Sequence, residues 1–289
     1  MFRKIGEQVW IFDAEWVPDP VTGRVIYALP ASLSDEEVVR EMWKRGGATP
    51  EEPMPFLKTA LCRVVVISIL VRREKEEEIT FHLHSLPLTH DSEKDQGEAT
   101  VLTAFLDEVG KFRPQLIGYN SQGSDLKIIL QRSLVHGIRA EKFVHRKGGR
   151  WEEPDYFNRD NDWNVDLMRI IGERGKTTPS LHEIAVACRI PGKINADGEH
   201  IATLWLRGER EKIIIYNQYD VLTTYLLWLR LVHFAGFMET EQFRNEEERF
   251  REFVLNEARE PKRSHLGHFI ETWDHLRGCG MDRNTGDRI

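Results

Sequence analysis

The sequence contains little cysteine, and its few cysteines form no recognisable pattern. Only Cys62, Cys188 and Cys279 occur among the 289 residues, and no C-x-x-C pair is present. An odd number of scattered cysteines argues against a disulfide framework and against a cysteine-ligated zinc site. It also indicates a reducing compartment, and we expect the protein to be cytoplasmic.

Long apolar runs and an excess of positive charge are missing as well. No run approaches the roughly 20 apolar residues that cross a bilayer, and the first residues, MFRKIGEQVW, lack the apolar centre of a signal peptide. The formal net charge is −7, whereas a protein that coats duplex nucleic acid usually carries a basic face. We therefore expect a soluble globular protein with no membrane partner, in which any contact with nucleic acid is local.

The order of the predicted elements indicates an α/β fold. Apolar, β-branched and alternating segments predict strands at 7–13, 63–73, 76–86 and 115–120, the second and third forming a hairpin. Helical spacing of apolar residues predicts helices at 98–112, 124–138, 180–192 and 209–237. Strands followed by interleaved helices favour a mixed β-sheet flanked by helices.

We expect one domain at 1–238 and a C-terminal extension at 239–289. Within the domain, residues 23–60 are predicted to be an insertion. It should contain a helix that begins after Ser34, because Glu37 follows three residues later as in a capping box. The extension is predicted to be a charged helix followed by a mobile tail rich in Gly, Arg and Asp.

The first predicted strand ends in two carboxylates. The segment reads VWIFDAEW, so Asp13 and Glu15 are separated by one residue. Alternate residues of a strand point to the same side, so these two like charges would share one face. A bound cation is the usual compensation for such repulsion, and it would need further ligands from elsewhere in the chain.

Two more carboxylates lie where they could complete such a site. Asp220 lies beside the apolar stripe of the longest helix, where a carboxylate is costly unless it is paired or binds a metal. Asp125 directly follows the strand 115–120, at a position where open α/β sheets bind ligands. Oxygen ligands of this kind suit Mg²⁺ or Mn²⁺. Two such ions about 3.5–4 Å apart are the usual arrangement for phosphodiester hydrolysis.

Three short motifs carry a resemblance to a known family. FDAE, GYNSQGSD and YNQYD resemble, in order and on the expected elements, the exonuclease motifs of the DEDD superfamily of 3′–5′ exonucleases, which have a ribonuclease H-like fold. The Tyr-x-x-x-Asp form of the third motif resembles the DEDDy branch, that of the family B polymerase proofreading domain. FDAEWVPD and RVVVISI are most similar to stand-alone predicted exonucleases related to that domain. The resemblance covers about residues 7–235.

The resemblance implies an activity and a partner. The chain would be a metal-dependent 3′–5′ exonuclease that releases nucleoside 5′-monophosphates from nucleic acid with a free 3′ end, preferably single-stranded DNA. The sequence contains no polymerase module, so any polymerase or repair partner would act in trans. Two Mg²⁺ or Mn²⁺ ions would be held by the four carboxylates, Asp13, Glu15, Asp125 and Asp220.

The resemblance also implies roles for neighbouring residues. Tyr216, four residues before Asp220 and on the same helix face, would orient the attacking water. Asn120 would position the substrate or its loop. Ser124 stands where the family usually has Phe or Tyr, which changes how the 3′-terminal nucleotide would be packed. Trp16 could supply the missing aromatic surface.

Several simpler interpretations stay open at this level. Asp125 alone can cap a helix, Asn120 can serve a turn, and Tyr216 with Asp220 can form a structural pair. The whole set could belong to a non-catalytic nucleic-acid binding module, or to an endonuclease of the same fold class. The intact acidic set argues against the first, and the helical Tyr–Asp pair favours an exonuclease over the second.

Three further features are expected to be structural or are undecided. His82 and His84 alternate on a strand and should be surface residues, and Asp166 should be a cap or a support for the fold. The segment 139–151 mixes basic and aromatic residues. It is equally consistent with a solvated loop and with a surface that holds a single strand by charge and stacking.

Overall fold

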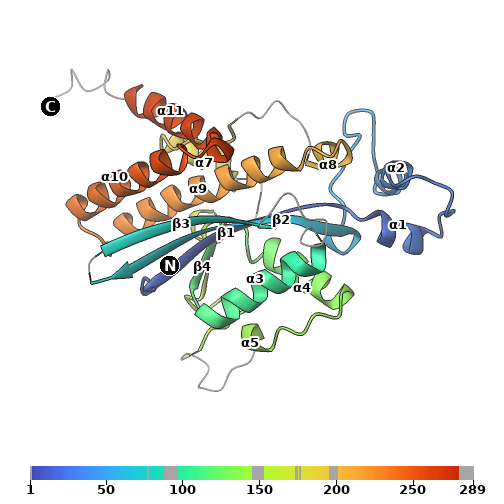
Figure 1. The fold of residues 1–289 in the computed structure, drawn as a ribbon, viewed down its shortest axis with the longest axis horizontal. Coiled ribbons are helices and arrows are strands. Elements are labelled where there is room, and N and C mark those ends of the chain that lie inside the picture. Colours follow the sequence, from blue (N-terminus) through green and yellow to red (C-terminus); the bar gives the residue numbers. More distant parts are fainter. Residues whose placement is uncertain are drawn as a thin grey trace.

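A mixed β-sheet forms the centre of the molecule. The computed structural model describes residues 2–76, 78–87, 97–144, 153–172, 175, 177–194 and 201–279. Its sheet has the order β3-β2-β1-β4-β5 (Figure 1). The strands are β1 (Gln8–Pro18), β2 (Cys62–Lys75), β3 (Glu78–Leu86), β4 (Gln115–Gly118) and β5 (Asn164–Asp166). β1, β2 and β3 pair antiparallel, whereas β4 runs parallel to β1 and to β5. The predicted α/β fold with a mixed sheet is confirmed.

The first three strands follow from their side chains. The run from Val9 to Phe12 is buried on both faces, as expected for a strand with neighbours on each side. β2 and β3 form the predicted hairpin, in which Phe81 and Leu83 point into the core. The intervening His82 and His84 are exposed, so their prediction as surface residues is confirmed.

Helices cover both faces of this sheet (Figure 1). One face carries α3 (Glu98–Phe112), α4 (Asp125–Val135) and the short α5 (Glu141–Val144). The other carries α9 (Arg210–Phe234), which crosses β1 and β2, together with α7 (Leu181–Ala187). α6 (Leu167–Ile171) directly follows β5. The predicted helices at 98–112, 124–138, 180–192 and 209–237 are therefore all present, each ending within a few residues of its expected limits.

A helical insertion follows β1. It contains α1 (Pro20–Tyr27) and α2 (Asp35–Arg45), and the capping box between Ser34 and Glu37 forms as predicted. Val39 and Trp43 of α2 pack in a third core with residues of β1, β2, α8 (Ile201–Leu206) and α9. The 3-10 helix η1 (Thr59–Leu61) then leads into β2. The insertion thus extends the far end of the β1–β2 ribbon (Figure 1).

The C-terminal part forms two helices on the outer side of α9. These are α10 (Thr240–Glu257) and α11 (His265–Gly278), separated by the 3-10 helix η2 (Pro261–Arg263). Phe250 and Trp273 are fully buried in the same core as α9. Most of the predicted mobile tail, from residue 280 onward, lies outside the described residues. None of the described helices is long and apolar enough to cross a membrane.

A buried ion pair joins α10 to the sheet across a long stretch of sequence. The Arg72 side chain on β2 donates to both carboxylate oxygens of Glu246, at 2.6 and 2.9 Å, and both side chains are 1% exposed. The Tyr225 hydroxyl donates to the same carboxylate at 2.7 Å. The guanidinium also lies over the Trp228 ring. Arg72 also donates to the half-exposed Glu74 at 2.9 Å. Removing Glu246 would leave the buried Arg72 charge with this one carboxylate at the edge of the core.

We therefore expect Glu246→Ala to lower the free energy of unfolding by roughly 3–5 kcal/mol, the usual cost of breaking a buried pair. Urea unfolding followed by circular dichroism measures it. Glu248→Ala is the matched control, because Glu248 is an exposed residue of the same helix. A loss no larger than the control's would contradict the prediction. The predicted division at residue 238 is tested in the same experiment, since a separate extension would unfold in its own transition.

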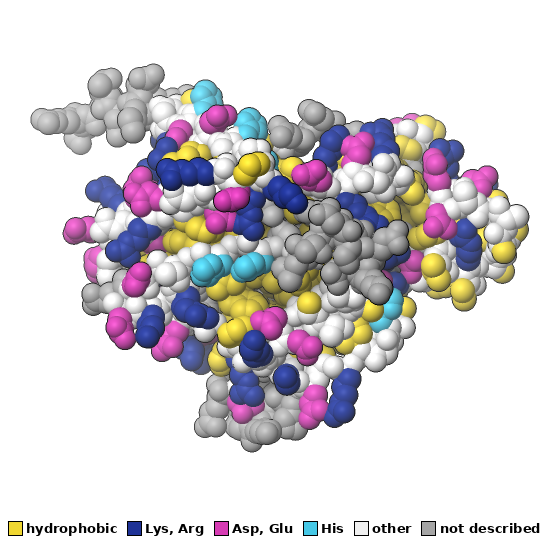
Figure 2. Space-filling model, viewed as in Figure 1, with side chains coloured by type: hydrophobic (Ala, Val, Ile, Leu, Met, Phe, Trp, Pro, Cys, Tyr) yellow, Lys and Arg dark blue, Asp and Glu magenta, His cyan; other side chains and the backbone are white. Residues whose placement is uncertain are grey.

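The surface carries charges of both signs. Figure 2 shows Lys and Arg side chains interspersed with Asp and Glu side chains over the described part of one face. This distribution matches the formal net charge of −7. It favours a local contact with a charged ligand over a broad electrostatic footprint.

Candidate metal-binding active site

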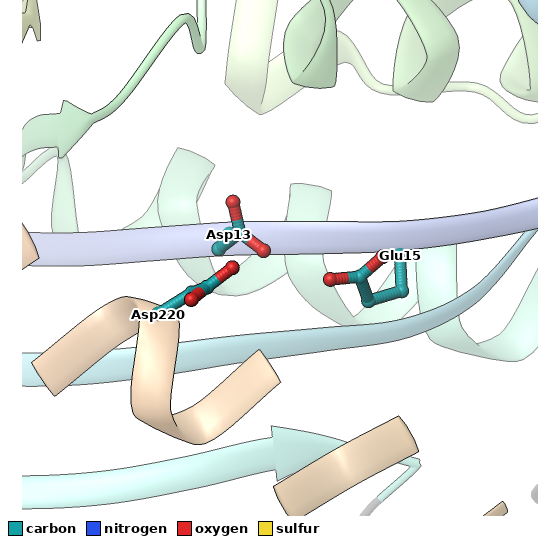
Figure 3. A group of neighbouring side chains, drawn as sticks. All are labelled: Asp13, Glu15 and Asp220. Carbon is teal, nitrogen blue, oxygen red and sulfur yellow. The ribbon is translucent and has the colours of Figure 1, made fainter. Parts of the chain in front are cut away.

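Three carboxylates meet between β1 and α9. Asp13 and Glu15 point from the same side of β1, and Asp220 points toward them from α9 (Figure 3). One oxygen from each lies within 4.8 Å of the others. Asp13 and Glu15, which repel each other, therefore face a third acidic residue and not a positively charged one.

β1 continues to Pro18, so the two carboxylates lie within the strand and not at its end, as the prediction of a strand at 7–13 had placed them. The backbone geometry at this point of β1 helps to aim their side chains. Asp13 lies opposite Ser68 and Glu15 opposite Val66 in the antiparallel pairing with β2. The register then shifts between Glu15 and Trp16. Such irregularities bend a strand and redirect its side chains, and they occur often beside active sites.

The fourth predicted carboxylate lies just behind this group. Asp125, at the start of α4, is 3% exposed. Its Oδ1 accepts a hydrogen bond from the Ala14 backbone N–H at 3.1 Å, which ties α4 to β1 between the two acidic residues. Its Oδ2 accepts from the Ser124 hydroxyl at 2.9 Å. All four predicted carboxylates are thus brought together, although Asp125 lies outside the closest group of three.

Burial and mutual repulsion raise the pKa of every member of this set. The pKa of Asp13 is raised by burial first and then by Asp125, Glu15 and Asp220. The pKa of Glu15 is raised by burial and then by Asp220 and Asp125. Burial, opposed by hydrogen bonds, raises the pKa of Asp125 to about 6 and that of Asp220 to about 7. The carboxylates therefore lack sufficient positive charge from the protein itself.

Asn217 contacts the acidic group, although the sequence motifs did not predict a role for it. Its side chain is fully buried, and its Nδ2 donates a hydrogen bond to Asp13 Oδ2 at 2.5 Å. Its Oδ1 is buried without a hydrogen-bond partner in the described part of the chain. The spacing could have identified it, because a residue three positions before Asp220 in a helix lies on a neighbouring face.

Lys193 also lies at the site, and the sequence analysis did not predict it, because no local pattern of residues indicates its position. Its Nζ lies over the Tyr216 ring, 5.7 Å from the centroid. Its charge opposes the rise in the pKa of both Glu15 and Asp220. Lys193 is exposed, so it supplies positive charge at the mouth of the site rather than inside it.

The segment that carries Lys193 is fixed at two points. The Pro191 carbonyl accepts a hydrogen bond from the buried Thr223 hydroxyl of α9 at 2.8 Å. The Lys193 backbone N–H donates to His182 Nδ1 at 3.0 Å. A Cβ at Gly192 would lie only 2.2 Å from that same His182 nitrogen, so the close approach requires glycine.

Tyr216 is half-buried beside the acidic group. Burial raises the pKa of its phenol, and the nearby Asp220, Glu15 and Asp13 raise it further. The hydroxyl therefore keeps its proton throughout the neutral range. A phenol in this state is a hydrogen-bond donor and acceptor, and it carries no charge that would repel an anionic ligand.

Asn120 and Asp166 shape the loop after β4. Asn120 has a positive φ of 64°, and its backbone N–H donates to Asp166 Oδ1 at 2.8 Å. The same carboxylate accepts from the backbone of Gln122 and of Met168, the latter as the N-cap of α6. Asp166 is thus both a cap and a support, as predicted. The loop borders a cavity of about 520 Å³, lined by Asn120, Gly123, Met168, Pro179 and Glu183 among others.

The remaining predicted substrate residues lie close by. The Ser124 hydroxyl oxygen lies 2.9 Å from both the Asn120 carbonyl oxygen and Asp125 Oδ2, so its one proton is shared between these two acceptors. Trp16 is partly buried against the core beneath α3 and α4. Their contact with a nucleotide stays a prediction. Of the segment 139–151, residues 145–151 lie outside the described residues, and α5 occupies part of the remainder.

The donor set fits a hard divalent cation. Every close ligand is a carboxylate oxygen, and neither cysteine nor histidine belongs to the group. Carboxylate oxygens suit Mg²⁺ and Mn²⁺ better than the softer transition metals. A divalent ion would also supply the positive charge that the raised pKa values show to be missing.

Comparison with known protein families shows to which family the chain belongs. The family described as predicted 3′-5′ exonuclease related to the exonuclease domain of PolB matches residues 54–273. The chain belongs to this family. Membership in the PolB-related exonuclease family implies nucleic acid as the substrate. Asp125, Tyr216 and Asp220 lie inside the matched segment, whereas Asp13 and Glu15 precede it and are brought to Asp220 by the fold.

A solved structure is similar to the structure of this chain. This member of the family is similar to the structure of the family B DNA polymerase from the hyperthermophilic archaeon Pyrobaculum calidifontis, with 17% sequence identity and a TM-score of 0.46. The similarity covers 98% of this chain and 31% of that chain, so the present chain spans about a third of the polymerase's length. None of the curated proteins matches the chain.

Proposed function

We propose that this protein is a metal-dependent 3′–5′ exonuclease that removes single nucleotides from single-stranded DNA and releases nucleoside 5′-monophosphates. The observation that carries the proposal is the convergence of Asp13, Glu15 and Asp220 within 4.8 Å, with Asp125 directly behind them. Their raised pKa values indicate a group that is incomplete without cations. Membership in a family of predicted exonucleases supports the reaction class.

The four carboxylates would hold two Mg²⁺ or Mn²⁺ ions. When bound, such ions supply Lewis-acid activation of a water molecule and stabilise charge on the leaving 3′ oxygen. The protein's own contribution is to fix the ligands in place. Asn217 holds Asp13 by a hydrogen bond, and Ser124 and the Ala14 backbone hold Asp125.

Residues around the carboxylates have separate tasks in this proposal. Tyr216, which stays protonated, orients the attacking water through its hydroxyl, as in DEDDy enzymes. Lys193 places a positive charge over that ring and offsets the negative charge of an incoming phosphate. Asn120, Ser124 and Trp16 contact the terminal nucleotide beside the cavity at the end of β4.

The setting of the reaction is likewise part of the proposal. We place the enzyme in the cytoplasm, where its three scattered cysteines stay reduced. A polymerase or repair protein would supply frayed 3′ ends in trans. Single strands are preferred because the site is local and the surface lacks the basic excess of a duplex-coating protein.

Hydrolysis of end-labelled oligonucleotides in the presence of Mn²⁺ or Mg²⁺ tests the proposal. We expect stepwise shortening from the 3′ end, 5′-monophosphate products and faster cleavage of a single strand than of a blunt duplex. Asp13→Asn should lose this activity. Binding without cleavage would support the non-catalytic module, and cleavage of a circular strand would support an endonuclease. Either result would overturn the proposal.

A further inference from the structure

Two arginines lie over one tryptophan ring beyond the acidic group. The Cζ of Arg63 on β2 lies 5.5 Å from the centre of the Trp205 ring, and the Cζ of Arg210 on α9 lies 4.5 Å from it. Trp205 itself belongs to α8 and packs against the core beside the insertion. Elements far apart in the sequence thus place two cations around one aromatic side chain.

Part of the Arg63 guanidinium lacks a hydrogen-bond partner among the described residues. All three side chains are partly exposed, and Arg63 Nε is buried without a hydrogen-bond partner in the part of the chain that the structure describes. Burial lowers the pKa of Arg210, and the neighbouring charge of Arg63 lowers it further. Interaction with an aromatic face stabilises each cation, but it does not remove the repulsion between the two cations. An anion that binds between or beside them would offset this repulsion.

The group lies close to the acidic residues and on the same side of the sheet. Arg63 pairs with Val17 of β1, which packs in one core with residues of α8 and α9, so Val17 lies on the sheet face where Glu15 meets Asp220 of α9. Two residues of strand span about 7 Å. Along α9, Arg210 precedes Asp220 by ten residues, or about 15 Å of helix. The two routes therefore separate the arginines from the acidic group by roughly 10–15 Å.

That separation suits a strand that enters the proposed active site. Phosphates of a stacked single strand follow one another at about 3.4 Å, so roughly three to four phosphates of such a strand, and fewer of an extended one, cover the distance. Guanidinium groups bind phosphate oxygens through paired hydrogen bonds. Trp205 would restrict both side chains and so reduce the entropy lost when they bind.

We propose that Arg63 and Arg210, held by Trp205, bind a phosphodiester group of the substrate strand a few nucleotides from its 3′ end. The inference rests on the proposed exonuclease function for the identity of the strand. Its ligand is the phosphodiester that DNA and RNA share. The group acts on binding of longer substrates and has no part in bond cleavage.

A length series of oligonucleotides tests the proposal. Fluorescence anisotropy, with Ca²⁺ present to slow hydrolysis, gives the affinity for strands of two to ten nucleotides, in one DNA series and one RNA series. For the wild type we expect affinity to rise once the strand reaches the arginines. Arg63→Gln should remove most of that rise, lowering affinity for the longest strand about tenfold. Losing one phosphate contact should also reduce the slope of log affinity against log salt by about 0.7.

Controls separate this effect from general loss of charge or of folding. Arg40→Gln removes the same charge from an exposed arginine of α2 that pairs with Glu36, and it should change neither quantity. Arg210→Gln should repeat the effect of Arg63→Gln, and Arg63→Lys should restore most of the salt slope. Thermal unfolding confirms that each variant folds.

The outcomes distinguish this inference from the proposed function. Hydrolysis of a nitrophenyl ester of a nucleoside 5′-monophosphate, which is too short to reach the arginines, should be the same in Arg63→Gln and the wild type. Equal affinity of variant and wild type at every length would overturn the inference, as would an equal loss at every length. If the wild type binds with the expected length dependence but cleaves nothing, the exonuclease proposal fails and the phosphodiester site stands. A difference between the DNA and RNA series would identify the natural strand.

Discussion

Asp220→Asn is expected to lower turnover by about 10³-fold or more, because it removes a charged ligand from the centre of the acidic group. Tyr216→Phe is expected to lose only roughly 10²-fold, the lower end of the range for one positioned proton-handling group. The two residues lie one helical turn apart on α9. The difference follows from their tasks, since Asp220 would hold a cation whereas the phenol only orients water.

Steady-state rates on an end-labelled oligonucleotide, together with Mn²⁺ titrations by calorimetry, measure both variants. Tyr216→Phe should keep near-normal metal affinity, whereas Asp220→Asn should bind Mn²⁺ far more weakly. Tyr219→Phe is a matched control, because its hydroxyl donates to the His265 carbonyl at 2.8 Å, away from the carboxylates. If Tyr216→Phe lost metal as severely as Asp220→Asn, the tyrosine would be structural.

Asp13→Asn should make the metal-free protein more stable at pH 8, even though it removes activity. With a chelator present, burial and mutual repulsion disfavour the ionised forms of the four close carboxylates and raise their pKa values, whereas the unfolded chain releases these protons freely at this pH. One neutral amide relieves part of that cost, and its oxygen can still accept the hydrogen bond from Asn217. Since one pKa unit corresponds to about 1.4 kcal/mol, we expect a gain on the order of 1–2 kcal/mol.

The same groups set the direction of the pH dependence. The pKa of Asp125 is about 6 and that of Asp220 about 7 in the folded protein, against an ordinary value of 3.8. Between these values the folded state retains protons that the unfolded chain has released. The metal-free protein should therefore be most stable near the acidic end of this window and lose stability as the pH rises from about 4 to about 7.

Urea unfolding at several pH values, with chelator or with Mn²⁺, measures this dependence. Mn²⁺ should stabilise the wild type most at the highest pH, because binding to the folded state alone adds to its stability. Asp107→Asn, an exposed change on α3, should alter none of these results. Stability that rises with pH in the presence of chelator would mean that the carboxylates are compensated by the protein.

Much of the site could be predicted because its members carry local signals. Asp13 and Glu15 directly follow the apolar run of β1, Asp125 starts the helix that follows β4 in the chain, and Tyr216 and Asp220 share a helical face. Strand alternation and helical spacing are properties of a few consecutive residues. The strands, the main helices and the capping box of the insertion could be predicted for the same reason.

Other features depend on contacts between distant parts of the chain. Lys193 reaches the site only because its segment is fixed to α7 and α9. Arg72 and Glu246 are separated by 174 residues, and the sequence around neither residue predicts that they form an ion pair. The tryptophan with its two arginines likewise draws on β2, α8 and α9. Such contacts follow from the packing of whole elements and have no local pattern.

The hydrogen bond between Asn217 and Asp13 spans 204 residues and ties the first strand to the long helix. Nearly the entire chain must therefore have left the ribosome before the acidic group can assemble. A nascent or prematurely terminated product that ends before α9 would carry Asp13, Glu15 and Asp125 but have neither Asp220 nor the helix that covers their face of the sheet. We therefore expect the proposed nuclease to be inert during its own synthesis, and recovery of activity after denaturation would report the docking of α9.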